Sequence, residues 1–249
     1  MCDNNKLLNE VNKFGRLVKL KNGIDYTTKI QPVISVCDKG NGNEQLNNPR
    51  VVTVDNRTGY IYVTDQYNNC VKVFDNTAKI GTCGEGELEF YSPYALTIDK
   101  ATNDIFICDY SNHRVQILSK EFSYKAQFGI DTLRYPLDVK LSHHNIYVLD
   151  CSNPCIHLSN NNLMLQKCII SRGAGNQVVK PYSFFVDTYD NILRADYDSN
   201  CKSIFNAKFE SIHKITVPEH PTGIIAVTTG NQHRIIVVCN NTMNCLQIF

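Results

Sequence analysis

A motif that recurs five times between residue 49 and residue 249 constrains the fold of this chain most strongly. Each copy has a proline, then a run that begins at Ile and ends four residues later at Asp or Asn, and then a second run that ends nine residues after that Asp or Asn. The prolines are spaced at intervals of 44, 43, 45 and 40 residues: Pro49, Pro93, Pro136, Pro181 and Pro221. A fixed period of this size, with several strand-like runs in each unit, predicts a β-propeller or a similar array of small sheets.

Each unit reads as four short strands, so the sequence predicts an all-β fold. In the second unit the expected strands are Ala95–Asp99, Ile105–Asp109, a run that closes at Leu118, and Tyr124–Phe128. These runs are rich in Ile, Val, Tyr and Phe and are bounded by residues typical of turns. Five units predict a propeller of five four-stranded blades. An incomplete six-bladed ring is the alternative.

The two ends of the chain suggest how such a ring would close. Phe249 ends a third strand, so the last unit lacks its fourth strand. Lys29–Cys37, which is followed by a Gly/Asn loop and Pro49, resembles a fourth strand. We expect this segment to complete the C-terminal blade and to remove an exposed sheet edge. The predicted organisation is a partly ordered lead-in over residues 1–28 and one propeller domain over residues 29–249.

The repeated columns resemble the NHL repeat. The best copies are Ile61–Phe74 and Ile105–Leu118, and the residues of Asp109–Ile117 are similar to the family pattern Asp-x-x-Asn-x-Arg-Ile-Gln-Val. Three later stretches resemble the propeller domains of invertebrate tripartite-motif (TRIM-NHL) proteins: Tyr135–Leu141, Asn153–Leu158 and Cys245–Phe249. The family propeller usually has six blades, whereas five units are counted here. No paired Cys-x-x-Cys spacing of a RING occurs, so the resemblance implies the recognition arm of such a ligase without its ubiquitin-transfer chemistry.

Composition narrows the classes of partner and compartment. With 25 basic and 24 acidic residues, the net charge of +1 argues against binding that is dominated by nucleic-acid phosphates. The sequence contains no run of about 18 apolar residues, so it predicts no membrane-spanning helix. The first five residues, Met1 to Asn5, lack the features of a signal peptide, so we expect a cytoplasmic protein. The odd count of 11 cysteines then predicts free thiols.

Two groups of potential ligands are interpreted as structural. The column that ends the Ile-containing runs is expected to accept hydrogen bonds from backbone amides of the following turn, rather than to bind calcium or act in acid–base catalysis: Asp65, Asp109, Asp150, Asp196 and Asn240. A second group of possible zinc ligands contains Cys151, Cys155 and His157, close in sequence to His143 and His144. Cys155 and His157 would share one face of a strand, but no second pair of ligands is visible, so a turn and a packed strand are favoured over a zinc site. We expect no metal and no cofactor.

The candidate binding residues lie in the loops of one face. In a propeller, the connections between second and third strands and those that lead into the prolines emerge on the same face. Tyr and Arg are enriched where binding energy concentrates, and aromatic residues beside Arg also stack on bases. The alternative is that the tyrosines only pack loops against neighbouring blades. The predicted partner-binding residues are Arg50, Gln66, Tyr67, Tyr94, Tyr110, His113, Arg134, Tyr135, Lys180, Tyr182 and Tyr197.

The sequence therefore predicts a non-catalytic recognition scaffold that binds a macromolecular partner through this face. A protein partner is expected, and single-stranded RNA is the alternative. The third hypothesis is a metal-dependent propeller lactonase or lyase, which would need metal ligands on the central channel, where the predicted first strands offer mainly apolar side chains. We expect a monomer and no catalytic residues.

Overall fold

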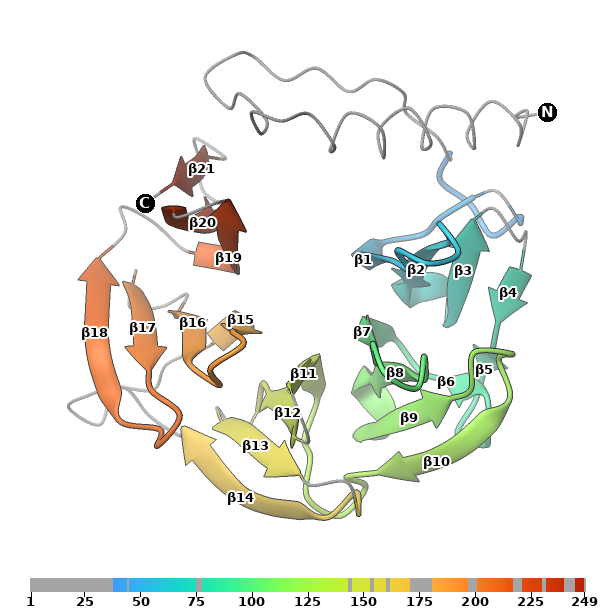
Figure 1. The fold of residues 1–249 in the computed structure, drawn as a ribbon. Helices are drawn as coiled ribbons and strands as arrows, with labels where there is room; N and C mark the ends of the chain where they lie inside the picture. Colours follow the sequence, from blue (N-terminus) through green and yellow to red (C-terminus); the bar gives the residue numbers. More distant parts are fainter. Residues whose placement is uncertain are drawn as a thin grey trace.

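The computed structural model describes residues 38–248, except residues 44, 75–77, 143–144, 153–154, 160–161, 171–180, 197–200, 217–220, 230–231 and 240–244. Five antiparallel sheets follow one another around a common centre (Figure 1). The prediction of an all-β propeller built from five repeated units is confirmed.

Four of the sheets have four strands, and the strands of each sheet follow their order in the chain. The first sheet contains β1 (Pro49–Val54), β2 (Ile61–Asp65), β3 (Cys70–Phe74) and β4 (Ala78–Ile80). The second contains β7 (Pro93–Ile98), β8 (Ile105–Asp109), β9 (Arg114–Leu118) and β10 (Tyr124–Phe128). The third contains β11 (Pro136–Ser142), β12 (Asn145–Asp150), β13 (Cys155–Ser159) and β14 (Leu165–Ile170), and the fourth β15 (Pro181–Val186), β16 (Ile192–Asp196), β17 (Cys201–Phe205) and β18 (Ser211–Thr216).

The fifth sheet has three strands among the described residues: β19 (Pro221–Thr229), β20 (Gln232–Cys239) and β21 (Cys245–Ile248). The predicted fourth strand, Lys29–Cys37, lies outside the described residues. Two short strands, β5 (Thr82–Cys83) and β6 (Glu89–Phe90), pair in the connection between the first and second sheets. Two 3-10 turns, η1 (Gln66–Asn68) and η2 (Tyr110–Asn112), follow β2 and β8.

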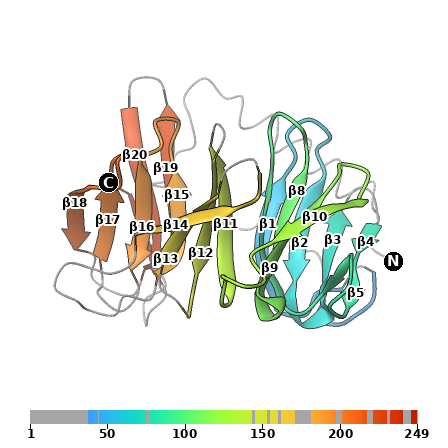
Figure 2. The same cartoon turned by 90° about the horizontal axis from the view of Figure 1, so that it is seen from below.

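The first strand of each sheet lies on the inner side of the arc, and the fourth strands lie outside (Figure 1). Figure 2 shows the strands side by side, with the connecting loops gathered at their two ends. The described sheets leave one side of the ring open, between the first and the fifth sheets (Figure 1). Among the described residues, no helical segment has the length and hydropathy that a bilayer span requires.

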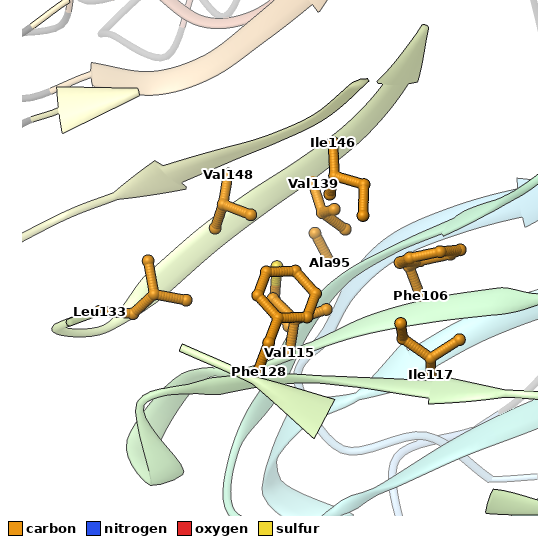
Figure 3. Packing of buried hydrophobic residues seen from close by; sticks show 10 residues of the cluster. Ala95, Phe106, Val115, Ile117, Phe128, Leu133, Val139, Ile146 and Val148 are labelled. Atoms are coloured by element: carbon orange, nitrogen blue, oxygen red, sulfur yellow. The ribbon is translucent and has the colours of Figure 1, made fainter. Parts of the chain in front are cut away.

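The core lies between the faces of neighbouring sheets. Phe106, Val115 and Phe128 of the second sheet pack against Val139 and Val148 of the third (Figure 3). A sheet that lies between two others, such as the second, is covered on both faces, so its strand β8 is buried at every position. This explains why the second strands read as continuous apolar runs rather than as alternating patterns.

Two details of the sequence interpretation are wrong. Cα pairing places Pro221 opposite Cys239, whereas the other prolines pair with the column aspartates, so Cys239 and not Asn240 occupies that column. Cys155 and Cys168 form a disulfide between neighbouring strands, with their Cα atoms 5.8 Å apart. The expectation of free thiols therefore fails for this pair, because the β13–β14 pairing brings together two cysteines that are 13 residues apart in the chain.

Candidate partner-binding face

Strand register brings the predicted loops to one end of the sheets. Pro49 pairs with Asp65 and Pro93 pairs with Asp109, so the start of each first strand lies beside the end of the second strand. The connections into the first strands and those out of the second strands therefore share one edge. We call this edge the loop face, and it comprises residues 38–43, 45–48, 66–69, 81–92, 110–113, 129–135 and 151–152, with Arg50 and Tyr94 at the starts of β1 and β7.

Buried aspartates tie the entering loops to this face. Asp65 accepts a hydrogen bond from the Asn47 amide at 2.6 Å, Asp109 from the Tyr91 amide at 2.8 Å, and Asp150 from the Arg134 amide at 2.6 Å. All three carboxylates are fully buried. The predicted backbone-amide role is confirmed for Asp65, Asp109 and Asp150, but the donors lie two residues before each proline rather than in the following turn.

Buried bases complete these aspartate sites. The Arg114 guanidinium donates to Asp109 at 2.8 Å and to backbone carbonyls of Glu85, Gly86 and Glu89. Burial raises the pKa of Asp109, although the Tyr91 amide, Asn112 and Arg114 oppose that shift. In the fourth sheet, Arg194 forms two hydrogen bonds with Asp196, and Ser203 adds a third at 2.8 Å. The Arg114 contacts fix the connection between the first and second sheets, and the Asp196 contacts join β16 and β17. Among the described residues, no group of three or more His, Cys, Asp or Glu could hold a metal ion.

A continuous row of side chains crosses three sheets on the loop face, and we call it the aromatic row. The Arg50 guanidinium lies 4.9 Å from the centre of the Tyr94 ring. The centres of the Tyr94 and Tyr110 rings are 5.5 Å apart, those of Tyr110 and Tyr135 are 4.9 Å apart, and those of Tyr135 and His113 are 4.4 Å apart. The structure thus brings together five of the predicted residues.

The backbone of Tyr135 is left-handed, with a φ of 64°. Asn48 and Ser92 occupy the same position before their prolines and have φ values of 60° and 57°. This conformation suits Asn, but it costs a bulky residue about 1–3 kcal/mol. Tyr135 is held in place by its amide, which donates to His113 Nδ1 at 3.2 Å, and by its carbonyl, which accepts from the Cys151 amide at 3.2 Å.

The predicted residues differ in exposure. The side chains of Tyr67, Tyr182 and Tyr135 are 61%, 38% and 37% exposed, and Arg50 and Arg134 are exposed as well. Tyr94 and Tyr110 are partly buried, and this burial raises the pKa of both phenols.

Three predicted positions need separate comment. Gln66 is buried and accepts hydrogen bonds from Arg50 Nε at 2.5 Å and from Asn48 Nδ2 at 2.7 Å, so it positions Arg50 rather than facing a partner. Lys180 and Tyr197 lie outside the described residues.

Sequence reasoning missed other members of the loop face. Tyr91 is 52% exposed, and Glu85 and Glu87 are exposed in the same connection. Tyr91 stands two residues before its proline, as Arg134 does, so the repeat column could have identified it. With Asp131 also exposed in the next connection, the face carries both signs of charge.

Comparison with known proteins identifies the repeat. The family model for the NHL repeat matches residues 90–118, from Phe90 to the end of β9. The second sheet carries an NHL repeat. Tyr94, Tyr110 and His113 of the aromatic row therefore belong to this NHL repeat. No characterised protein sequence matches the chain.

Solved structures show a similar propeller fold. A streptogramin B lyase structure aligns with a TM-score of 0.61 at 14% identity, over 81% of this chain and 68% of that one. A catalytically inactive virginiamycin B lyase from Staphylococcus aureus with quinupristin aligns with a TM-score of 0.59 at 12% identity, over 83% of this chain and 72% of that one. At such low identity the likeness concerns the fold.

Proposed function

We propose that this chain is a recognition scaffold that binds a protein partner through the loop face of its first three sheets. The aromatic row carries this proposal. It offers rigid rings and an arginine at one end of the propeller, on loops that buried aspartates hold in place. Large aromatic side chains give contact area at a low cost in conformational entropy, and Arg adds directional hydrogen bonds.

The alternative that these tyrosines only pack loops accounts for part of the row. Tyr94 and Tyr110 are partly buried, and both contact the core between the third and fourth sheets. Packing does not account for Tyr135 of the row, which is 37% exposed, or for Tyr67 and Tyr91 elsewhere on the loop face, which are 61% and 52% exposed. We therefore assign partner contact to the exposed rings and support of the loops to the buried ones.

Mixed charge favours protein over RNA as the partner. Arg50 and Arg134 are exposed on the loop face, but so are Glu85, Glu87 and Asp131. A surface that tracks a phosphate backbone is predominantly positive. The resemblance to TRIM-NHL proteins also implies recognition of a partner, and single-stranded RNA remains the second candidate because the exposed tyrosines could stack on bases.

A lyase activity is the third candidate, and only the names of the similar structures favour it. Its specific requirement would be a set of ligands or acid–base groups on the inner strands. Asp138 and Lys140 of β11 form an ion pair at 2.8 Å, which makes Asp138 a structural partner of Lys140. Burial raises the pKa of Asp138, and Lys140 opposes the shift.

The test compares two sets of substitutions in affinity enrichment from cell lysate. The double variant Tyr67→Ala with Tyr135→Asn removes two exposed rings and keeps, at position 135, a residue that Asn48 shows to be compatible with the left-handed backbone. Tyr189→Ala is the matched control, because Tyr189 is 78% exposed in the β15–β16 turn at the opposite end of the sheets. We expect the double variant to lose its partner and the control to keep it.

RNA is tested separately with a labelled random single-stranded RNA in fluorescence anisotropy. Binding that falls steeply between low and physiological salt, together with partner retention that ribonuclease abolishes, would favour RNA. Retention of the same proteins by the double variant would contradict the proposed face.

A further inference from the structure

Arg50, at the start of β1, is held in place by neutral groups. Its Nε donates to Gln66 Oε1 at 2.5 Å, and its guanidinium lies 4.9 Å from the centre of the Tyr94 ring. Gln66 is buried, and its Oε1 also accepts from Asn48 Nδ2 at 2.7 Å. Tyr94 is anchored as well, because its carbonyl accepts from Thr64 Oγ1 at 2.7 Å. The hydrogen bond and the ring therefore restrain the Arg50 side chain together, and neither carries a charge that neutralises it.

The other arginines whose side chains the structure describes are of two kinds. Three form ion pairs with nearby aspartates: Arg57, Arg114 and Arg194. Arg134 is exposed on the loop face, and its side chain makes no hydrogen bond or ion pair with a described residue. Arg50 combines the two conditions, because it is held in place like the paired arginines but forms no ion pair among the described residues. Its charge therefore has a fixed position and is still available to a ligand.

Hydrogen-bond donors at and beside Arg50 also lack an acceptor in the described part of the chain. Of its guanidinium N–H groups only that on Nε finds one there, so the N–H groups of both terminal nitrogens are available. The hydroxyls of Tyr94 and Tyr110 form no hydrogen bond with a described residue either. Burial raises the pKa of the Tyr94 phenol, and Arg50 opposes that shift, so Tyr94 offers a neutral O–H at physiological pH. Since the first strands lie on the inner side of the arc (Figure 1), Arg50 and Tyr94 lie at the inner edge of the loop face.

An anion complements this set of donors, and the surroundings indicate which kind. A guanidinium binds a carboxylate through two parallel hydrogen bonds. One held cation matches one negative charge, whereas a nucleic-acid backbone presents a row of them. Capture of a C-terminal carboxylate relies on free backbone amides, but the amides of Val51 and Tyr67 donate within the protein, to Thr64 Oγ1 and to the Asn47 carbonyl, at 3.0 Å each. An acidic side chain is therefore the ligand that fits best.

We infer that Arg50 binds an aspartate or glutamate side chain in an exposed segment of the partner, while apolar residues beside that acid contact the exposed rings of Tyr67 and Tyr135. This inference rests on the proposed function, because it names the chemistry of the partner that the loop face binds. Gln66 is the positioning residue, since a guanidinium that is already ordered loses less conformational entropy on binding. The loop face also exposes acidic residues, such as Glu85, Glu87 and Asp131. They would repel a uniformly acidic segment, so the expected ligand has one acid flanked by apolar residues.

Peptide selection followed by a double-mutant cycle tests the inference on the full chain. The probe is a phage library of random peptides that are fused through their C-termini, so no free carboxyl end is presented. The best binder is synthesised with an amidated C-terminus, once with its acid and once with the corresponding amide, Gln or Asn. We expect Arg50→Gln and the amide peptide each to raise Kd about tenfold or more, and their combination to raise it no further, because both remove the same pair. Arg57→Gln is the control, since it removes the same charge at the opposite end of the sheets and should bind both peptides as the natural sequence does.

Arg50→Lys is the second variant, and it replaces Arg50→Gln in the cycle if the latter does not fold. It keeps the charge but loses the paired N–H groups, so most of the tenfold loss should remain.

Three results would overturn the inference and leave the proposed function standing: no enriched peptide, enriched peptides without an acid, or losses from Arg50→Gln and from the amide peptide that simply add. Single-stranded RNA binding that Arg50→Gln abolishes would assign Arg50 to a phosphate instead. Peptides that bind the double variant Tyr67→Ala with Tyr135→Asn as tightly as the natural sequence would refute the loop face itself, and with it the proposed function.

Discussion

The two ends of the sheets use the same residue type in different ways. At the end opposite the loop face, Asp55, Asp99 and Asp187 each accept a hydrogen bond from the amide two residues later, so each turn closes on itself. At the loop face, Asp65, Asp109 and Asp150 reach amides that are 16 to 18 residues away. Aromatic contacts then join the loops of neighbouring sheets. Local turns can vary independently, whereas the loop face is one connected surface.

Of all the substitutions that compare the two ends, Asp109→Ala at the loop face is expected to lower the free energy of unfolding most. Removing this carboxylate leaves Arg114 buried without its charged partner and frees the Tyr91 amide. Loss of one member of a buried ion pair costs about 3–5 kcal/mol. Urea unfolding should show this loss in the free energy of unfolding. A change below 1 kcal/mol, or loss of calcium binding without loss of stability, would contradict the structural role.

Alkaline pH should produce the next largest effect. Burial raises the pKa of Tyr147 to about 12, and the Tyr147 hydroxyl lies 3.3 Å from Asp190. Below a pH of about 10, the Tyr147 phenol is neutral in both the folded and the unfolded chain. Above it the unfolded chain ionises first, so the free energy of unfolding falls as the pH rises from about 10 to 12, by about 2 kcal/mol.

Tyr147→Phe is the matched variant for that titration. Between pH 8, 10 and 11.5, the free energy of unfolding should change less for this variant than for the natural sequence. Identical pH dependence of the two proteins would show that Tyr147 is not the group responsible.

Asp99→Ala should cost much less than Asp109→Ala. Asp99 accepts from the Ala101 amide in a solvent-accessible turn, where water can replace the lost bond. We expect a loss of about 0.5–1 kcal/mol in the same urea experiment. A loss as large as that of Asp109→Ala would remove the distinction between local and long-range aspartates.

The smallest effect on stability is expected from Tyr135→Asn. Asn tolerates the left-handed backbone that Tyr135 adopts, which offsets the lost ring contacts with Tyr110 and His113. The free energy of unfolding should stay within about 0.5 kcal/mol. A loss of 2 kcal/mol or more would mean that Tyr135 serves the fold rather than a partner.

The repeat period allowed the strands, the five units and the shared face of the loops to be predicted from sequence. Other features depend on three-dimensional register or burial. In the fifth sheet the residue opposite the proline is Cys239, which stands six positions before its Cα partner Cys245. In the fourth sheet the equivalent residue, Asp196, stands only five positions before its partner Cys201, so the spacing of the other units places the column one residue too late in the fifth. Gln66 turns inward to hold Arg50, although its column suggested an exposed loop residue. Tyr94 and Tyr67 look alike in sequence, and only packing distinguishes the half-buried ring from the exposed one.

Site-specific photo-crosslinking tests the proposed partner face most directly. A photoreactive phenylalanine analogue replaces Tyr67 in one sample and Tyr189 in another, since both side chains are exposed but lie at opposite ends of the sheets. We predict a protease-sensitive, ribonuclease-resistant adduct from position 67 and none from position 189. An adduct from position 189 alone, a ribonuclease-sensitive adduct from position 67, or no adduct at position 67 above the level at position 189 would contradict protein recognition by the loop face.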